Sequence, residues 1–163
     1  MAELSAPVAR VHRSFLDAMS EFGAEGRGAT ADATMVGAEI RACQANWSTP
    51  AGFEAYLRWL RGQVMEDSPR PDGYVPSTTL WWVDGTEYLG RIAVRHRLTA
   101  RLRDVRGHIG YDIRPSARRR RHSAALPAGR AGRSAVAVRR QAVLQQRLVG
   151  DAGRGGSAAA DRG

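Results

Sequence analysis

The stretch that decides the fold is STTLWWVDGTEYLGRIAV, residues 77–94. β-Branched and aromatic side chains dominate both of its halves, as they do in strands that pack against a core. Between the halves lies Asp84-Gly85, a dipeptide that favours the tight turn of a β-hairpin. The stretch is therefore predicted to form two neighbouring antiparallel strands. Successive side chains of a strand point to opposite faces, so Trp81 and Trp82 are expected on opposite faces of the sheet.

Two helices are predicted before this hairpin. Between Val8 and Phe22, apolar residues recur at steps of three and four, which indicates an amphipathic helix that ends at a group of glycines. A second helix is predicted to begin near Pro50, because Ser48 or Thr49 can cap its first turn. The apolar residues expected on its buried face are Phe53, Tyr56, Leu57 and Leu60.

The segment that indicates a ligand-binding function is residues 107–120, GHIGYDIRPSARRR. A third strand is predicted from His108 to Ile113, followed by a turn and an arginine-rich helix start. The N–H groups at the start of a helix bind anions, and guanidinium groups strengthen such a site. A pyrophosphate suits this site, and the backbone of the strand can pair with an extended arm that contains amides. Coenzyme A combines both features.

Three segments resemble the GNAT superfamily of acyl-CoA N-acyltransferases, and within it an uncharacterised bacterial branch. They are VPSTT (75–79), LGRIAVRH (89–96) and the 107–120 motif, in the family's order. The resemblance covers about residues 1–120. It implies an α/β (α+β) fold, with a twisted, mostly antiparallel sheet flanked by helices and splayed where the cofactor enters. It also implies an N-acetyltransferase that moves an acetyl group from acetyl-CoA, as co-substrate, to an amine acceptor.

The resemblance also assigns site residues. For the thioester and the pantetheine arm it implies contacts, mostly through the backbone, along the strand residues Ile109, Gly110, Tyr111 and Ile113. For the pyrophosphate it implies Arg114, Arg118, Arg119, Arg120 and Arg121. His96 and His108 are candidates for the general base, although a histidine on a strand is more often structural. Tyr111 is a candidate for orienting the substrate, but a half-buried tyrosine in the sheet is the favoured interpretation. Glu87 and Asp112 are carboxylates without an evident partner. Because Cys43 is the only cysteine, an internal disulfide and a thiolate metal cluster are excluded, and no metal is expected.

The composition changes at about residue 120. Residues 1–120 contain all eleven aromatic residues and carry a net charge of +3. Residues 121–163 contain no aromatic residue and carry a net charge of +6. A segment with so few large apolar side chains buries little surface, so 121–163 is predicted to be a weakly structured Arg/Ala/Gly-rich tail. The C-terminal half of a GNAT-like domain would then be incomplete.

The pyrophosphate pattern of the family, Arg/Gln-x-x-Gly-x-Gly/Ala, departs at the same place. Arg121 stands where the pattern has a glycine that lets the backbone approach a phosphate. No tyrosine follows Tyr111, although the family commonly uses a late tyrosine to protonate the leaving thiolate. Impaired activity is therefore expected. Either 121–163 is a divergent basic tail, or the reading frame has shifted near 120–121; read one nucleotide later, Arg121-His122 can become Gly-Thr, which restores the glycine.

Two other classes of function remain open. A basic protein that binds nucleic acid non-specifically would explain a net charge of +9, but the charge is concentrated in the tail and no aromatic residues interleave it. A GNAT-fold interaction module without catalysis is the second. No run of about 20 apolar residues indicates a membrane span and no secretory signal is visible, so a cytoplasmic protein is expected. An unfinished sheet edge would also favour a homo-oligomer.

Overall fold

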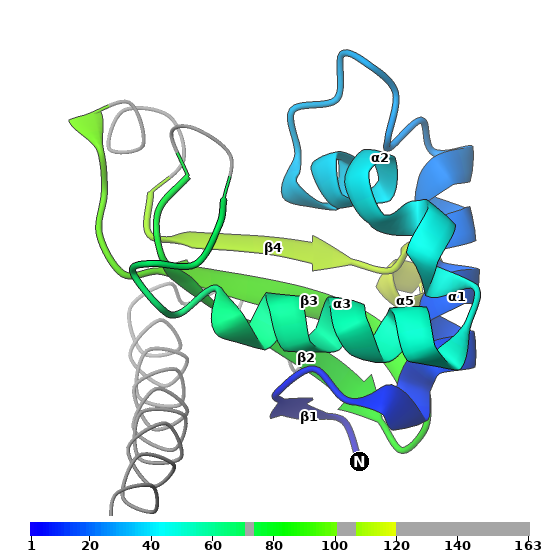
Figure 1. The fold of residues 1–163 in the computed structure, drawn as a ribbon. Coiled ribbons are helices and arrows are strands. Elements are labelled where there is room, and N and C mark those ends of the chain that lie inside the picture. Colours follow the sequence, from blue (N-terminus) through cyan, green and yellow to red (C-terminus); the bar gives the residue numbers. More distant parts are fainter. Residues whose placement is uncertain (71–73, 101–106, 120–163) are drawn as a thin grey trace, which may run out of the picture.

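The computed structural model describes residues 1–70, 74–100 and 107–119. Four antiparallel strands form one sheet in the order β1-β2-β3-β4 (Figure 1). They are β1 (Glu3–Ser5), β2 (Ser77–Asp84), β3 (Glu87–Arg95) and β4 (Ile109–Ile113). The predicted α+β class is confirmed as a mixture of helices and an antiparallel sheet. The division into a 1–120 domain and a 121–163 tail stays a prediction, because the tail lies outside the described residues.

Three helices pack against one face of the sheet (Figure 1). They are α1 (His12–Ala24), which follows a 3-10 turn at Ala9–Val11, α2 (Met35–Trp47) and α3 (Pro50–Gly62). The helices predicted from Val8 and from Pro50 are confirmed, whereas α2 and the short β1 were not predicted. The core between helices and sheet centres on Phe15, whose ring contacts five other aromatic rings: Trp47, Phe53, Tyr56, Trp81 and Tyr88.

Helices α2 and α3 begin with the same capping device. The Thr49 hydroxyl accepts a hydrogen bond from the Gly52 N–H at 3.1 Å, and Pro50 occupies the first turn of α3. The Thr34 hydroxyl likewise accepts from the Gly37 N–H at 3.2 Å at the start of α2. Each bond satisfies one of the N–H groups that have no partner within the first turn of a helix. Of the two residues predicted to cap α3, it is Thr49 that does so.

The predicted hairpin is confirmed. Asp84 pairs with Glu87 across the turn, where Gly85 has a φ of 57°, a left-handed conformation that glycine adopts without strain. Trp81 packs into the core beneath the helices, and Trp82 packs on the opposite face with Leu89. The sequence therefore placed the two tryptophans correctly.

Strand β4 pairs with β3 and leads directly into the short helix α5 (Pro115–Arg119). The two strands approach closely at Gly90, where a Cβ atom would lie 2.6 Å from the carbonyl oxygen of Asp112. On the face opposite α1–α3, Ala117 of α5 packs against Trp82 and Leu89. None of the helices in the described ranges is both long enough and apolar enough to cross a membrane.

Candidate functional site around strand β4 and helix α5

The outer edge of β4 offers backbone hydrogen-bonding groups. The Arg95 N–H donates to the carbonyl of His108 at 2.8 Å, and the Arg114 N–H donates to that of Leu89 at 2.9 Å. Because the bonded pairs of an antiparallel ladder alternate, and the β3–β4 register has no shift, every second residue between these two points turns its backbone away from β3. These outward residues are Ile109, Tyr111 and Ile113.

This alternation divides the predicted cofactor residues of the strand. Ile109, Tyr111 and Ile113 present N–H and C=O groups to the outer edge, whereas Gly110 directs its own toward β3. Within the described ranges, no strand pairs with that outer edge. The carbonyl of Ile113 does accept a hydrogen bond from Arg118 Nε at 2.9 Å, which shows that it points away from β3.

The start of α5 holds an anion that belongs to the chain itself. The Glu21 carboxylate of α1 accepts hydrogen bonds from the Ser116 N–H at 2.8 Å and from the Ser116 hydroxyl at 3.0 Å. Arg114 Nη2 lies 2.7 Å from the same carboxylate. Partial burial raises the pKa of Glu21, but these hydrogen bonds and the charge of Arg114 outweigh it and leave the pKa below its usual value. Glu21 thus occupies the position where the sequence predicts a phosphate.

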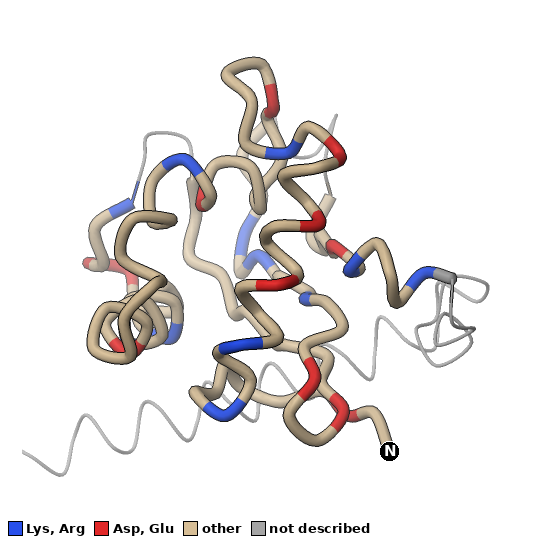
Figure 2. Tube along the Cα trace, turned by 90° about the vertical axis from the view of Figure 1, so that its right-hand side faces the viewer, with Lys and Arg blue, Asp and Glu red and all other residues tan. Residues whose placement is uncertain are grey.

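The second predicted phosphate ligand is also paired. Arg118 Nη1 lies 2.9 Å from a carboxylate oxygen of Glu25 at the end of α1. Figure 2 shows acidic and basic positions side by side where α1 meets α5. Arg119 ends α5, while Arg120 and Arg121 lie outside the described residues. The guanidinium groups of Arg114 and Arg118 therefore neutralise two carboxylates of α1.

The three candidates for catalysis lie near or on β4. His96 follows β3, and its Nε2 lies 2.9 Å from the Thr78 hydroxyl. His108 precedes β4 and is half-buried, as is His96. Since Arg95 is bonded to His108 through the backbone, both imidazoles belong to the same end of the sheet, opposite α5. Tyr111 is 63% exposed, so the favoured expectation that it is half-buried in the sheet is wrong.

The environment of His96 favours the neutral imidazole. Burial lowers its pKa, and the charges of Arg70 and Arg97 lower it further, while Glu66 opposes them. A neutral imidazole can accept a proton, so His96 keeps the protonation state that a general base needs.

A largely buried ionic cluster, which was not predicted, lies between α2 and the sheet. Arg91 of β3 is 3% exposed, and its Nη1 lies 2.6 Å from Glu39 of α2. Its Nε lies 3.4 Å from Asp112 of β4. The Tyr56 hydroxyl of α3 donates to the same oxygen of Glu39 at 2.5 Å. Asp112 therefore has a partner, and Glu87 also has one, Arg114, at 3.9 Å; the expectation that these two carboxylates lack partners is wrong.

The cluster fixes its own ionisation states. Burial raises the pKa of Tyr56, and the charge of Glu39 raises it further, so the phenol stays protonated. Burial alone lowers the pKa of Arg91, but Glu39 and the other acidic neighbours outweigh this and hold it well above its usual value. Arg91 Nη2 and the Tyr88 hydroxyl are buried and have no hydrogen-bond partner among the described residues. One signal for this cluster was present in the sequence: an arginine at the centre of an otherwise apolar strand.

A pocket opens beside Glu39, between α2, α3 and the first residues of β2. Its volume is about 110 Å³. Its walls are mainly apolar, with Glu39 as the charged residue, and they comprise Met35, Ala38, Glu39, Ala42, Cys43, Trp59, Leu60, Gln63, Tyr74, Val75, Ser77 and Thr79. Burial and the nearby charge of Glu39 raise the pKa of Cys43, so this thiol is a poor nucleophile.

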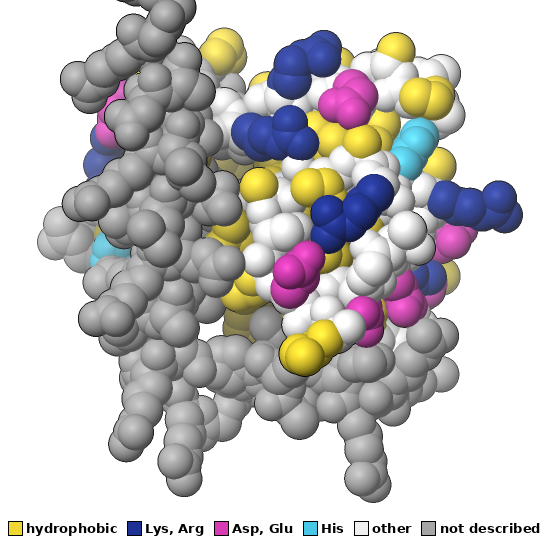
Figure 3. Space-filling model, turned by 90° about the horizontal axis from the view of Figure 1, so that it is seen from below, with side chains coloured by type: hydrophobic (Ala, Val, Ile, Leu, Met, Phe, Trp, Pro, Cys, Tyr) yellow, Lys and Arg dark blue, Asp and Glu magenta, His cyan; other side chains and the backbone are white. Residues whose placement is uncertain are grey.

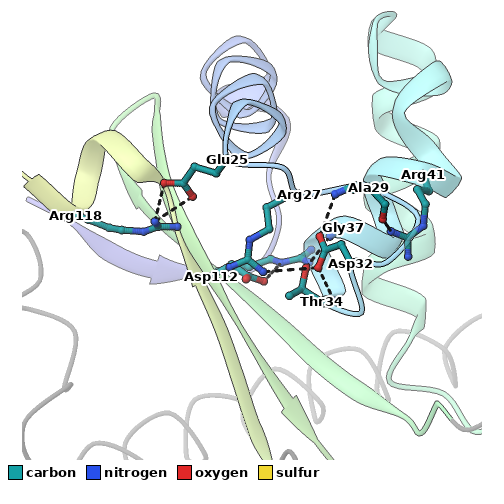
Figure 4. A network of polar contacts seen from close by, with 11 residues as sticks. Glu25, Arg27, Ala29, Asp32, Thr34, Gly37, Arg41, Asp112 and Arg118 are labelled. Atoms are coloured by element: carbon teal, nitrogen blue, oxygen red, sulfur yellow. Dashed lines mark hydrogen bonds and ion pairs between the residues drawn. The ribbon is translucent and has the colours of Figure 1, made fainter.

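The loop between α1 and α2 is folded around Asp32 (Figure 4). Its carboxylate accepts hydrogen bonds from the Gly28 N–H at 3.0 Å and the Thr34 N–H at 2.9 Å, and Arg27 lies 3.9 Å away. Partial burial raises the pKa of Asp32, but these hydrogen bonds outweigh it and bring the pKa to about 2. Arg41 donates to the carbonyl of Ala29 at 2.7 Å and ties the loop to α2. The loop therefore holds α2, and with it Glu39, over the sheet.

Basic side chains do not gather into one patch on the face shown in Figure 3. There, arginines alternate with acidic and apolar side chains. Among the residues that the structure describes, no group of three or more His, Cys, Asp or Glu is placed to hold a metal ion.

Comparisons of the chain with protein-family models, with curated proteins and with solved structures found no match. The assignment of function therefore depends on the residues and their geometry.

Proposed function

We propose that the chain is an N-acetyltransferase that uses acetyl-CoA and acts on an amine. The observation that carries the proposal is the outer edge of β4, where Ile109, Tyr111 and Ile113 turn their amide groups away from β3. An extended ligand with amides along its length can add to such an edge as a further strand does. The five residues of β4 span about 15 Å at the usual rise of a strand, which is long enough for a pantetheine arm.

The phosphate end of the ligand fits less well. Arg114 and Arg118 are the described guanidinium groups at this end of β4, and each is paired with a carboxylate of α1. A pyrophosphate must then compete with Glu21 and Glu25, or be held by the arginines that follow Arg118. Together with Arg121 in place of a glycine, this leads us to expect weak binding and impaired turnover.

The residues at the other end of β4 suit the chemistry of an amine acceptor. Acetyl-CoA supplies an activated acyl group on a thioester. His108, which precedes β4 and has the same orientation in the register as Gly110, lies on the helix face of the sheet and can take the proton that the attacking amine loses, directly or through a water. The thiolate that leaves has no later tyrosine to protonate it, which is a further reason to expect slow turnover.

A single proline substitution in β4 tests the proposal. Tyr111→Pro removes an N–H that faces outward and leaves the bonds to β3 in place, and proline is tolerated in edge strands. Tyr111→Val is the matched control, because it removes the side chain and keeps the N–H. We expect the two variants to melt within a few degrees of each other. The proline variant is expected to bind acetyl-CoA with an affinity at least about tenfold lower, because one lost hydrogen bond is worth about 1.4 kcal/mol. Equal affinity in both variants would contradict the proposal.

A further inference from the structure

We propose that the pocket beside Glu39 binds the acceptor as a small organic cation with a single apolar or aromatic body. This inference rests on the proposed function, and it assigns both the place of the acceptor and its chemical class. It draws on three independent properties of the pocket: its charge, its walls and its position relative to β4.

The charge of the site is negative. Arg91 is shared between Glu39 and Asp112, so the three groups together carry one excess negative charge. Among the residues that the structure describes, the hydrogen bonds of Glu39 with Tyr56 and with Arg91 both use its Oε2 atom, and Glu39 also lines the pocket. Its second oxygen is therefore available to a donor that enters from the pocket. An ammonium group is the donor that such a carboxylate favours, because a charged pair is stronger in a partly buried site than in water.

The walls select the body that carries the cation. Trp59 and Tyr74 line the pocket and are 38% and 46% exposed, so their rings are accessible. Aromatic faces attract cations and also pack against flat apolar groups. The remaining walls include Met35, Leu60 and Val75, which offer no hydrogen bonds.

The size of the pocket limits the ligand. Its 110 Å³ is somewhat less than the roughly 150 Å³ of an engineered cavity that holds one benzene molecule. One ring or one short branched chain therefore fills the pocket.

The pocket lies close to the predicted position of the thioester. Thr79, which lines the pocket, pairs with Ala93, and Ala93 pairs with Gly110 of β4. Two strand spacings separate Thr79 from Gly110, or about 10 Å. Met35 also lines the pocket, and its Cε lies 3.8 Å from the place where a Cβ of Gly110 would stand. An amine in the pocket is thus on the same face of the sheet as Gly110 and His108, and the side chain of Met35 lies between the pocket and Gly110.

The test uses the full chain without acetyl-CoA, so that it does not depend on transfer. Binding of 4-fluorobenzylamine is measured through the broadening of its ¹⁹F resonance, and 4-fluorobenzyl alcohol is the neutral ligand of matched shape. We expect the amine to bind at least tenfold more tightly than the alcohol. Equal binding of the two, or binding of neither, would overturn the inference.

Two pairs of variants locate the binding site. Ala38→Leu fills the pocket from α2 and is expected to abolish binding of the amine, whereas Ala45→Leu adds the same side chain at an exposed position of the same helix and is expected to leave it unchanged. Glu39→Gln removes the charge and is expected to lower the affinity for the amine to that for the alcohol, with Glu54→Gln as the control. If Glu39→Gln fails to fold, the comparison of Ala38→Leu with Ala45→Leu still tests whether the amine binds in the pocket. Retained binding in Ala38→Leu would overturn the inference.

The two proposals fail separately. If the amine binds in this pattern and acetyl-CoA does not bind, the pocket remains a site for organic cations and the acetyltransferase proposal falls. If acetyl-CoA binds and the amine shows no preference over the alcohol, the pocket is excluded as the acceptor site and the proposed function stands.

Discussion

Glu21 and Arg114 lie 93 positions apart in the chain and form an ion pair of 2.7 Å that joins the end of β4 to α1. The same carboxylate also accepts both donors of Ser116. One side chain thus fixes the connection between the last described strand and the last described helix. Because Arg114 is 12% exposed and Glu21 is 28% exposed, this pair is screened less by water than a surface ion pair.

Glu21→Gln is expected to destabilise the fold by about 1–3 kcal/mol, because it removes the charge that Arg114 and the Ser116 amide bind. The measurement is the free energy of unfolding in urea at pH 7. Glu25→Gln is the matched control, and it is expected to cost less, since its partner Arg118 is 41% exposed. A larger loss in Glu25→Gln would contradict this account.

The same carboxylate predicts a dependence on acid. The pKa of Glu21 is lowered in the folded state, so the folded state binds fewer protons than the unfolded chain. Stability from Glu21 is therefore present above the usual pKa of 4.5 and is lost as the pH falls through the lowered value. The slope of unfolding free energy against pH below 4.5 should be shallower in Glu21→Gln than in the parent. An unchanged slope would show that the carboxylate is not held as described.

Gly90→Ala is expected to destabilise the protein by about 1–3 kcal/mol, because a Cβ there meets backbone that has no room to move. The contact is with the carbonyl oxygen of Asp112 at 2.6 Å. Gly23→Ala is the control: a Cβ at Gly23 meets nothing within 4 Å, and alanine favours the helix, so a gain of about 0.5–1 kcal/mol is expected. Thermal unfolding of both variants gives the signs. Equal effects would be incompatible with a close approach of β3 and β4.

His96 predicts a second effect of pH, nearer neutrality. Its pKa in the folded state is lowered, mainly by burial, so protonation favours the unfolded chain. This part of the stability is present above pH 6.5 and is lost as the pH falls from 6.5 through the lowered pKa. In His96→Gln, the melting temperature should fall less between pH 7.5 and 5.5 than in the parent. His108→Gln controls for the loss of an imidazole at the same end of the sheet, and the same change in both variants would refute the role given to burial.

The alternation along β4 predicts which amides a bound ligand protects. Acetyl-CoA should slow hydrogen exchange at the N–H groups of Tyr111 and Ile113, which face outward. The N–H groups of Gly110 and Asp112, which are directed to β3, should change little. Exchange followed residue by residue with NMR gives the pattern, and uniform protection of all four would indicate a general stabilisation in place of contact along the edge.

Most of the fold could be predicted from the sequence, because its signals are local. Thr49 and Pro50 set the start of α3, and Asp84-Gly85 sets the hairpin. Helix α2 was missed because its apolar residues are few and include glycine and alanine; only Val36, Gly37, Ile40 and Trp47 of its residues are buried. The Thr34 cap was a signal for it. Strand β1 is three residues long, too short for a periodic pattern to indicate it.

The candidate site could be predicted only in part, because its interactions are long-range. The path from β4 into an arginine-rich helix was legible in residues 107–119, and the structure contains it. The partners of those arginines could not be predicted, since Glu21 and Glu25 lie on a helix that no local pattern places beside α5. Glu39 was missed for the same reason, because it lies on the helix that was not predicted.

The most direct test of the account is calorimetric titration of the full 163-residue chain with acetyl-CoA, with desulfo-CoA as a ligand that keeps the pantetheine arm and the phosphates. We expect saturable binding of both ligands at one site per chain, with reduced affinity for acetyl-CoA in Tyr111→Pro and not in Tyr111→Val. A folded chain that binds neither ligand would contradict the central claim that β4 and α5 form a coenzyme A site.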